Sequence, residues 1–449
     1  MLKILLVGSG AREHAIARAL KKSKHEHDLV CFASNENPGI VSLSQHYTVG
    51  SFNDIDAIQQ FAVQYEVDFA IIGPELPLSL GVVDFLQDKG IDCIGSAEQL
   101  AQIETSKGFA RDLLARYQIP ASPLYKTFNS LNGTAEFLKT LGDEYVIKAD
   151  GLMGGKGVKL SKEHLFDHKA ALFYCDDLLS NKQSFVIEEK LLGAEFSLMS
   201  FSDGKNLAHM PVVQDHKRVF VDDKGVNTGG MGSYSSANHE LPFLDENDIK
   251  KAQQINQAVI EALYKEFGIL YKGILYGGFI LTKSGVKLIE YNARFGDPEA
   301  INVLALLETD FIDICQAIIS ESLNQTEVKF AKKATVCKYL VPQNYPDAPC
   351  VGQEIDVSQV NSHENLYYAA VNAKKNSQTG EHKVYTTGSR SLAVLGVADS
   401  IAEAEEEAEV IAQQVQGTLY HRKDIGTAEL INKRINQVNH ICSKDYKLL

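Results

Sequence analysis

The segment KADGLMGGKGV, residues 148–158, contains four glycines and two lysines and directly follows the apolar run 145–147. A glycine-rich segment after a buried strand is typical of loops that bind phosphate on their backbone. The spacing excludes a P-loop, because only three residues separate Gly151 from Gly155 and a glycine follows Lys156 where a P-loop has Ser or Thr. A phosphate-binding loop of another class and a flexible hairpin tip both remain open.

Length and composition indicate a soluble protein of several domains. The 449 residues correspond to about three domains of roughly 150 residues each. A hydrophobic content of 45% with 23% charged residues is that of an ordinary folded protein. The formal net charge of −14, without a segment dense in lysine and arginine, argues against a nucleic-acid partner.

Cysteine usage and hydropathy predict a cytoplasmic protein. The seven cysteines are scattered, odd in number and without a C-x-x-C pair, which is typical of reduced thiols. The chain starts with MLKILLVGSG, which predicts a strand rather than a signal peptide, and no apolar run reaches transmembrane length. We therefore expect no membrane partner.

The first hundred residues alternate between strand and helix patterns. Buried strands are predicted from four apolar runs, at 2–7, 29–33, 68–73 and 91–95. Helical spacing is present at 12–22, 57–65 and 78–88. This alternation predicts an open parallel sheet covered by helices, whose ligands bind at the carboxyl ends of the strands. Two glycine-rich segments lie at such ends, GSGAREHA (8–15) and GPELPL (73–78).

The rest of the chain changes to an α+β pattern. A helix predicted at 97–117 leads to an inserted βα unit at 123–192, which contains the glycine-rich segment. Later strands are expected at 194–202, 273–282 and 286–294, and further strands follow from about residue 331. The acidic run AEAEEEAE, 402–409, is interpreted as the solvent-exposed face of a helix.

The N-terminal GSGAREHA matches a dinucleotide fingerprint only in part. Glu13 stands at the third glycine position, and no acidic residue ends the second predicted strand. A phosphate monoester at the helix N-terminus suits these residues better. A tight turn without a ligand stays open, as does a dinucleotide-dependent oxidoreductase.

The segment KLIEYNARFGDPE, 287–299, carries the most specific chemistry. On a strand, Glu290, Asn292 and Arg294 project from the same face. A carboxylate and an amide oxygen are hard ligands suited to magnesium, which also binds nucleotide phosphates. The planar guanidinium of an adjacent arginine suits a phosphate oxygen. We therefore interpret this strand as a metal and phosphate site rather than an exposed ion pair.

Other segments contain residues that suit a nucleotide bound at this metal and phosphate site. Lys148 ends a strand and Lys107 begins a helical region, where both suit phosphate contacts. The backbone of VIEEKLLGAEF, 186–196, suits an adenine edge, and Glu195 suits ribose hydroxyls. QDHKR, 214–218, and NTGGMGSYS, 227–235, are polar loops of the kind in which binding residues concentrate.

Taken together, these segments resemble the ATP-grasp superfamily, and within it the glycinamide ribonucleotide synthetases. The matching motifs run nearly end to end: GSGAREHA, GPELPL, KADGLMGGKGV, VIEEKLLGAEFS, QDHKR, NTGGMGSYS, YNARFGDPE and HRKDIG (421–426). RFGDPE together with NTGGMG is the most specific pair.

The resemblance implies a multidomain α/β and α+β fold. An N-terminal open parallel α/β substrate domain would cover 1–101, and the main ATP-grasp subdomain 102–122 and 193–328. The lid subdomain would cover 123–192 and a small α+β C-terminal domain 329–430, with a tail at 431–449.

The resemblance also assigns roles to residues. Arg294, Asp297 and Lys148 would be catalytic. ATP would be bound by Lys107, Lys148, Gly151, Gly154, Gly155, Gly157, Glu188, Glu189, Leu191 and Glu195. The other substrates would be bound by Gly8, Gly10, Gly73, Pro74, Glu75, Asp215, Lys217, Arg218, Asn227, Thr228, Gly229 and Gly230. Glu290 and Asn292 would ligate Mg²⁺ or Mn²⁺.

The implied reaction, a step of purine biosynthesis, joins glycine to 5-phosphoribosylamine. ATP as co-substrate would phosphorylate the glycine carboxylate, and the amine would displace phosphate from glycyl phosphate, giving glycinamide ribonucleotide and ADP. Alternatives are another ATP-grasp ligase, such as the formate-dependent glycinamide ribonucleotide transformylase, and a non-catalytic nucleotide-binding regulator. We expect a monomer or a weak dimer.

Some positions depart from the commoner patterns of the family or of the superfamily. Ala11 replaces a common glycine, and Gly278 stands where other ATP-grasp enzymes carry a second metal carboxylate. LVPQNYP, 340–346, and TTGSRS, 386–391, differ from commoner forms, and we interpret both as lying away from the chemistry.

Overall fold

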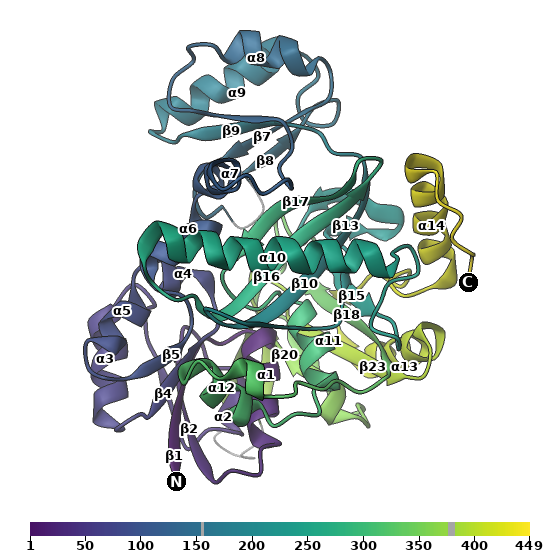
Figure 1. Ribbon diagram of the computed structural model, residues 1–449. Coiled ribbons are helices and arrows are strands. Elements are labelled where there is room, and N and C mark those ends of the chain that lie inside the picture. Colours follow the sequence, from purple (N-terminus) through teal and green to yellow (C-terminus); the bar gives the residue numbers. More distant parts are fainter. Residues whose placement is uncertain (154–156, 376–381) are drawn as a thin grey trace.

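Five short strands form the parallel sheet at the N-terminus (Figure 1). The computed structural model describes residues 1–153, 157–375 and 382–449. In spatial order the strands are β3 (His46–Val49), β2 (His27–Ala33), β1 (Leu2–Val7), β4 (Phe69–Ile72) and β5 (Asp92–Ile94). From β1 the chain adds strands first on one side of the sheet and then, from β4, on the other. The carboxyl ends of β1 and β4 therefore form the crevice where such sheets bind ligands. The sequence analysis missed β3, because its residues are partly exposed and form no apolar run.

The helices around this sheet agree with two of the three predicted and differ from the third. They are α1 (Ala11–Lys21), α2 (Pro38–Val41), α3 (Ile55–Gln64), α4 (Glu75–Ser79) and α5 (Val82–Gln87). The single helix predicted at 78–88 is wrong, since α4 and α5 are separated by Gly81 with a φ of 78°. The helix predicted at 97–117 is likewise two, α6 (Glu98–Thr105) and α7 (Lys107–Arg116). They meet at the extended Ser106, whose hydroxyl accepts from the Phe109 amide and caps α7.

The inserted unit has a hydrophobic core of its own. Its antiparallel sheet contains β6 (Tyr125–Phe128), β9 (Phe185–Glu189), β7 (Tyr145–Ala149) and β8 (Val158–Leu160). Helices α8 (Thr134–Leu141) and α9 (His168–Ser180) cover one face. Residues such as Ile147 and Phe185 pack in a cluster separate from the main core. The unit projects from one end of the molecule, as a lid would (Figure 1).

The central antiparallel sheet carries the predicted metal strand. Its order is β11 (Leu207–His209), β10 (Gly193–Asp203), β16 (Lys272–Thr282) and β17 (Gly285–Asn292). The long helix α10 (Glu246–Phe267) lies across it (Figure 1), and α11 (Glu299–Leu306) and α12 (Phe311–Ile319) follow β17. A bulge in the pairing of β16 with β17 lies between Gly278 and Phe279. Gly278 pairs with Glu290, so a carboxylate side chain at position 278 would lie opposite Glu290.

One sheet joins the central region to the C-terminal region. Its order is β12 (Gln214–Asp215), β15 (Gly232–Ser235), β18 (Ala334–Pro342), β23 (Leu392–Ala398) and β20 (Leu366–Tyr368), and β25 (Leu419–Tyr420) pairs with β18. A smaller sheet contains β21 (Val371–Lys375), β22 (His382–Thr386), β19 (Glu354–Asp356) and β24 (Gln416–Gly417). The remaining hairpin is β13 (Arg218–Phe220) with β14 (Lys224–Asn227). We propose that the chain divides into the predicted domains. This sheet then contains strands from both sides of the boundary at residue 328.

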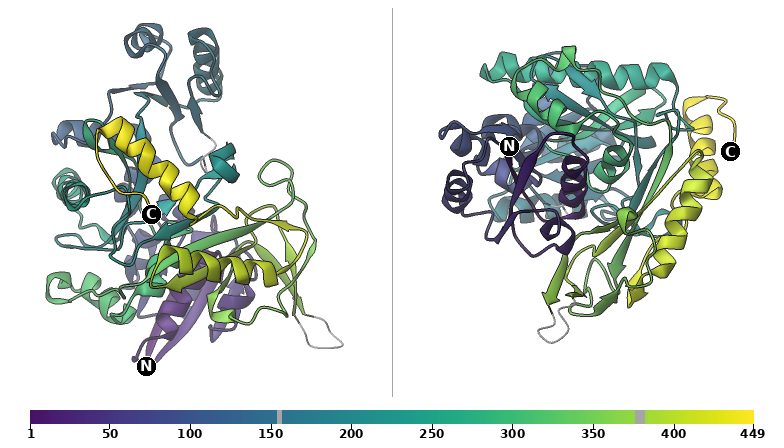
Figure 2. Two further views of the ribbon diagram at one scale, coloured as in Figure 1. Left: turned by 90° about the vertical axis from the view of Figure 1, so that its right-hand side faces the viewer. Right: turned by 90° about the horizontal axis from the view of Figure 1, so that it is seen from below.

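Two helices complete the C-terminal region. Helix α13 (Ile401–Gln414) packs on β18 and β23, and α14 (Ala428–Cys442) packs on β10 and β16 (Figure 2). The segment 431–449, predicted only as a tail, thus mostly forms α14, whose Ile431, Ile435 and Val438 are buried. Figure 2 also shows the N-terminal sheet beside the C-terminal region, where α1 contacts β20. Among the described residues, no helix is long and apolar enough to cross a membrane.

The acidic run of α13 is not only a solvent-exposed surface, as the sequence analysis proposed. Lys338 on β18 is fully buried, and its ammonium lies 2.6 Å from Glu405 Oε1 and 2.8 Å from Glu409 Oε2. Glu407 Oε2 accepts a hydrogen bond from the Val397 amide. The run therefore supplies counter-charges to a lysine that the hydrophobic pattern of β18 does not reveal.

We expect Lys338→Ala to lower the free energy of unfolding by about 3–5 kcal/mol, because it leaves two carboxylates near the core without their cation. Thermal denaturation would show this as a lower Tm. Lys333→Ala is the control, since Lys333 pairs with Asp399 at the surface, where such pairs contribute little. Equal Tm values for the two variants would contradict the prediction.

Candidate functional site

A cavity of about 300 Å³ lies where the lid, the central sheet, the N-terminal region and the C-terminal region meet. It is lined by many of the residues predicted from sequence: Glu75, Lys107, Lys148, Gly151, Gly157, Glu188, Asp215, Lys217, Thr228, Gly229, Glu290, Asn292, Arg294 and Asp297. These residues come from segments more than two hundred residues apart, from Glu75 to Asp297, and the fold brings them to one cleft.

Glu188 on β9 forms the most buried ion cluster of the cleft. Its carboxylate lies 2.7 Å and 3.0 Å from two Arg111 nitrogens and 2.8 Å from Lys148 Nζ. Arg111 also donates to the carbonyls of Leu288 and Ile289, and Lys148 Nζ donates to the Ile289 carbonyl at 3.1 Å. Burial alone would raise the pKa of Glu188, but Arg111 and Lys148 lower it to about 2. The cluster thus fastens the lid strands to α7 and β17, and the Glu188 carboxylate is already paired.

Asp150 connects the glycine-rich segment to the start of α7. Its Oδ1 accepts from the backbone amides of Lys107 at 2.6 Å and Gly108 at 3.3 Å, and its Oδ2 accepts from Ser106 Oγ at 3.0 Å. Lys107 Nζ donates to the Gly151 carbonyl at 2.8 Å. The sequence analysis missed Asp150, although an acidic residue beside a glycine-rich loop is a usual partner of a helix N-terminus. Gly154, Gly155 and Lys156 lie outside the described residues.

The predicted metal strand brings its oxygen atoms into the cleft. Glu290 Oε1 lies 3.1 Å from Lys217 Nζ, and this lysine lowers the pKa of Glu290 to about 2. The amide oxygen of Asn292 accepts from Arg294 at 3.1 Å. The carboxylate is therefore charged at neutral pH, and cationic groups already surround it.

Arg294 lies between carboxylates from two other elements. Its Nη2 is 2.9 Å from Glu104 of α6, and its Nε is 3.4 Å from Glu75 of α4. Burial would raise the pKa of Glu75, but Arg294 and Arg12 lower it to about 2. Glu104 also accepts from the Ala293 amide at 2.8 Å. Glu104 and Arg12 were not predicted, because their sequence context does not distinguish a buried charged side chain from one on the exposed face of a helix.

Arg390 overturns our interpretation of TTGSRS as lying away from the chemistry. It lines the cleft, and its Nη2 lies 3.3 Å from Asp297 Oδ2. Its Nη1 donates to the carbonyls of Gly229, Gly230 and Asp297 at 2.7–2.9 Å. Asp297 also accepts from the Tyr339 hydroxyl, and the guanidinium lies 4.2 Å from the centre of the Tyr339 ring. The C-terminal region thus contributes a cation to the cleft, which only the tertiary contacts reveal.

Glu13 explains the incomplete dinucleotide fingerprint. Its Oε2 accepts from the Gly10 amide at 2.6 Å, so one donor at the start of α1 is already satisfied. A Cβ at Gly8 or Gly73 would lie 2.3 Å or 2.2 Å from the Glu13 side chain. The glycines around this crevice therefore make room for Glu13. Gly10 itself lies close to Asp297, since a Cβ there would be 3.8 Å from Oδ2.

Several predicted residues lie outside the cavity lining. Among the described residues these are Gly8, Gly10, Gly73, Pro74, Glu189, Leu191, Glu195, Arg218, Asn227 and Gly230. Glu189 Oε1 accepts from the Leu124 amide at 3.1 Å. Arg218 pairs with Asn227 across the β13–β14 hairpin and forms an ion pair with Glu163 of the lid. The roles assigned to these residues remain predictions.

The cleft lies between two antiparallel sheets, those of the lid and of the central region, and cations and carboxylates line it. This arrangement is that of an ATP-grasp ligase. Models of the phosphoribosylglycinamide synthetase N domain, ATP-grasp (A) domain and C domain match residues 2–104, 105–300 and 335–428. The chain belongs to the phosphoribosylglycinamide synthetase family. This confirms the predicted family and fold class.

Individual proteins agree with this assignment. The phosphoribosylamine–glycine ligases of Methanosarcina barkeri and Methanocaldococcus jannaschii are each 46% identical to this chain, over 98% of it and 100% of the relative. A crystal structure of phosphoribosylamine–glycine ligase from Thermotoga maritima matches with a TM-score of 0.78 at 26% identity, covering 94% of this chain and 100% of that one. A dinucleotide-dependent oxidoreductase and a non-catalytic regulator are therefore not favoured.

We expect Glu188→Gln to destabilise the protein by about 3–5 kcal/mol at neutral pH, because Arg111 and Lys148 lose their counter-ion. The folded pKa of about 2 lies below the ordinary value of 4.5, so the stabilisation is complete above pH 4.5 and is lost as the pH falls toward 2. The Tm deficit of the variant should therefore shrink below pH 4.5.

Thermal denaturation of wild type and variant across this range is the measurement. Glu189→Gln is the matched control, because glutamine can still accept from the Leu124 amide. A Tm deficit that is the same for both variants, or that grows toward acid, would contradict the role of the cluster.

Proposed function

We propose that this protein joins glycine to 5-phosphoribosylamine with ATP, through glycyl phosphate, and releases glycinamide ribonucleotide, ADP and phosphate. The observation that carries the proposal is the meeting of Lys107, Lys148, Lys217, Glu290 and Arg294 in one cleft beneath the lid. Family membership and the names of the relatives support the same reaction. A formate-dependent glycinamide ribonucleotide transformylase is the alternative that the relatives do not favour.

The phosphates of ATP lie, in this proposal, between the lid and β17. Lys148 and Lys107 face the cleft from the end of β7 and the start of α7, with Gly151 and Gly157 beside them. Lys148 is held by Glu188 and so has a fixed position, whereas within the described part of the chain the Lys107 side chain donates only to the Gly151 carbonyl. The backbone of 188–191 would contact adenine and Glu195 the ribose. The assignment of Gly154 and Gly155 to ATP binding stays a prediction.

The oxygen ligands of the cleft fit a divalent cation. Glu290 is an ionised carboxylate, and the Asn292 amide oxygen lies on the same strand, facing the same cleft. Both are hard donors of the kind that Mg²⁺ and Mn²⁺ accept, with phosphate oxygens and water completing the coordination. Bound there, the cation would neutralise charge on the transferring phosphoryl group. Lys217 at 3.1 Å from Glu290 and Arg294 beside Asn292 add positive charge at the same place.

Asp215 is the proposed partner of the glycine ammonium group. Its Oδ1 is buried, and no group among the described residues donates a hydrogen bond to it. Burial and the nearby Glu299 raise the pKa of Asp215 well above its ordinary value. An ammonium group would satisfy this oxygen and compensate the repulsion. Thr228 and Gly229 lie beside it and would close the glycine site.

The ribose phosphate of the amine substrate would bind at the N-terminal crevice. Gly8, Gly10 and the segment 73–75 lie at the carboxyl ends of β1 and β4, and Glu75 reaches the cleft. The N-terminus of α1 is the end of a helix that favours an anion. This places the amine toward Asp297, which lies near Gly10.

The chemistry then needs no side-chain nucleophile. The glycine carboxylate oxygen attacks the γ-phosphorus, the bond to the β-phosphate oxygen breaks, and ADP leaves. The amine nitrogen next attacks the carbonyl carbon, phosphate leaves, and the amine loses a proton. The protein contributes position and charge, and the lid excludes water from the acyl phosphate.

The substrates can be tested directly by measuring ADP formation. We expect turnover with ATP, Mg²⁺, glycine and 5-phosphoribosylamine, and none when either glycine or the amine is omitted. Turnover with formate and glycinamide ribonucleotide instead would refute the proposal in favour of the transformylase.

Glu290→Gln tests the metal ligand. We expect the Mg²⁺ concentration for half-maximal activity to rise about tenfold or more, because the amide loses the charge that a hard cation prefers. Glu299→Gln is the control, since Glu299 lines the same cleft but accepts from the Tyr276 hydroxyl. Identical Mg²⁺ titrations for Glu290→Gln and wild type would exclude ligation by Glu290.

A further inference from the structure

The QDHKR segment presents alternate side chains to the cleft. Asp215 and Lys217 line it, whereas the ring of His216 between them is buried and stacks on Tyr234 with the ring centres 6.0 Å apart. This alternation is that of an extended chain. His216 therefore cannot touch the substrates, but its position determines where the backbone under Asp215 and Lys217 lies.

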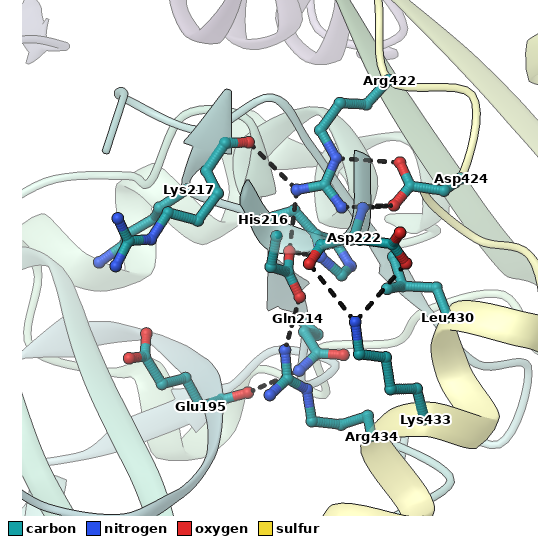
Figure 3. A network of polar contacts seen from close by, with 12 residues as sticks. Glu195, Gln214, His216, Lys217, Asp222, Arg422, Asp424, Leu430, Lys433 and Arg434 are labelled. Carbon is teal, nitrogen blue, oxygen red and sulfur yellow. Dashed lines mark hydrogen bonds and ion pairs between the residues drawn. The ribbon is translucent and has the colours of Figure 1, made fainter. Parts of the chain in front are cut away.

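Asp223 contacts the His216 ring and is itself held by two arginines. Its Oδ1 lies 3.4 Å from His216 Nδ1 and 2.8 Å from Arg422 Nη1, and its Oδ2 lies 3.0 Å from Arg434 Nη2. Burial lowers the pKa of His216, so the imidazole is neutral and the proton on Nδ1 is assigned by the facing carboxylate. Figure 3 shows Arg422 and Arg434 reaching this network from opposite sides.

The turn that carries Asp223 has an unfavourable backbone conformation. Asp222 and Asp223 have φ values of 63° and 57°, so two consecutive residues with a Cβ are left-handed. Asp424 holds the turn by accepting from the Asp222 amide at 2.9 Å, and Arg422 binds both oxygens of Asp424 at 3.0 Å and 2.7 Å. The surrounding contacts therefore impose a conformation that the turn alone would not favour.

The HRKDIG segment that supplies Arg422 is fixed to the C-terminal core. The buried Lys338 donates to the Lys423 carbonyl at 3.0 Å, and His421 contacts Glu409 at 3.1 Å. Arg422 is fully buried and also donates to the Arg218 carbonyl at 3.1 Å, at the end of QDHKR. A continuous set of polar contacts thus runs from α13 and β18 to the backbone of the cleft.

We propose that Arg422, Asp223 and His216 are positioning residues that hold Asp215 and Lys217 in register with glycine and the metal strand. The inference rests on the proposed function, because it assigns the glycine ammonium group to Asp215. It gives the HRKDIG segment and α14, which lie outside the cleft, a role in the ligation.

Asp223→Asn compared with Asp222→Asn tests this role. Asparagine tolerates the left-handed conformation, so both substitutions keep the turn and remove one charge. Asp222 is a matched control because its carboxylate is half-exposed and, as far as the structure describes the chain, makes only 3.5 Å contacts with Lys224 and Lys433. We expect Asp223→Asn to lower kcat/KM for glycine by about tenfold to hundredfold, the scale of a small misplacement of catalytic groups. The KM for ATP should change by less than about threefold, because Lys107 and Lys148 lie on other elements.

Each outcome decides a separate question. A wild-type protein that forms no ADP with glycine and 5-phosphoribosylamine refutes the proposed function. An active wild type, with Asp223→Asn equal to Asp222→Asn or with the KM for ATP raised as much as the KM for glycine, refutes the positioning role alone. If Asp223→Asn does not fold, Arg434→Gln decides, since it removes one partner of Asp223 from a partly buried position on α14. A smaller loss specific to glycine supports the proposal, and wild-type kinetics overturns it.

Discussion

The ion cluster of Glu188, Arg111 and Lys148 is the interaction on which the cleft depends. It joins β9 and β7 of the lid to α7, and Arg111 and Lys148 extend it to the carbonyls of β17. The lid has its own hydrophobic core and so could move as a unit, but this buried pairing fixes its base. Strand β7, which leads into the glycine-rich segment, is thereby held beside β17.

Paired charges recur throughout the site. Arg294 lies between Glu75 and Glu104, Lys217 faces Glu290, and Arg390 faces Asp297. Each of these three cations is held by a carboxylate before a substrate would bind. Such preorganisation suits a reaction whose catalysis consists of positioning and charge neutralisation, because little rearrangement is needed when the substrates bind.

The C-terminal region is part of this arrangement rather than an appendage. It shares a sheet with the strands β12 and β15 that flank QDHKR and NTGGMG, and it contributes Arg390 directly. Its buried Lys338 holds both the acidic face of α13 and the HRKDIG segment. The same few interactions that stabilise this region therefore also determine the shape of the cleft.

The sequence by itself determined the family through its motifs and the parallel N-terminal sheet through its alternation of strand and helix patterns. It also indicated many residues that line the cleft, because phosphate loops and metal strands use local patterns of residue type. Helix boundaries at Gly81 and Ser106 were not predictable, since helical periodicity continues across both breaks. Arg390, Glu104 and Asp150 needed the tertiary structure, because a polar residue on a loop or helix looks the same in sequence whether solvent or a buried partner satisfies it. Only the packing of distant segments decides which charges meet.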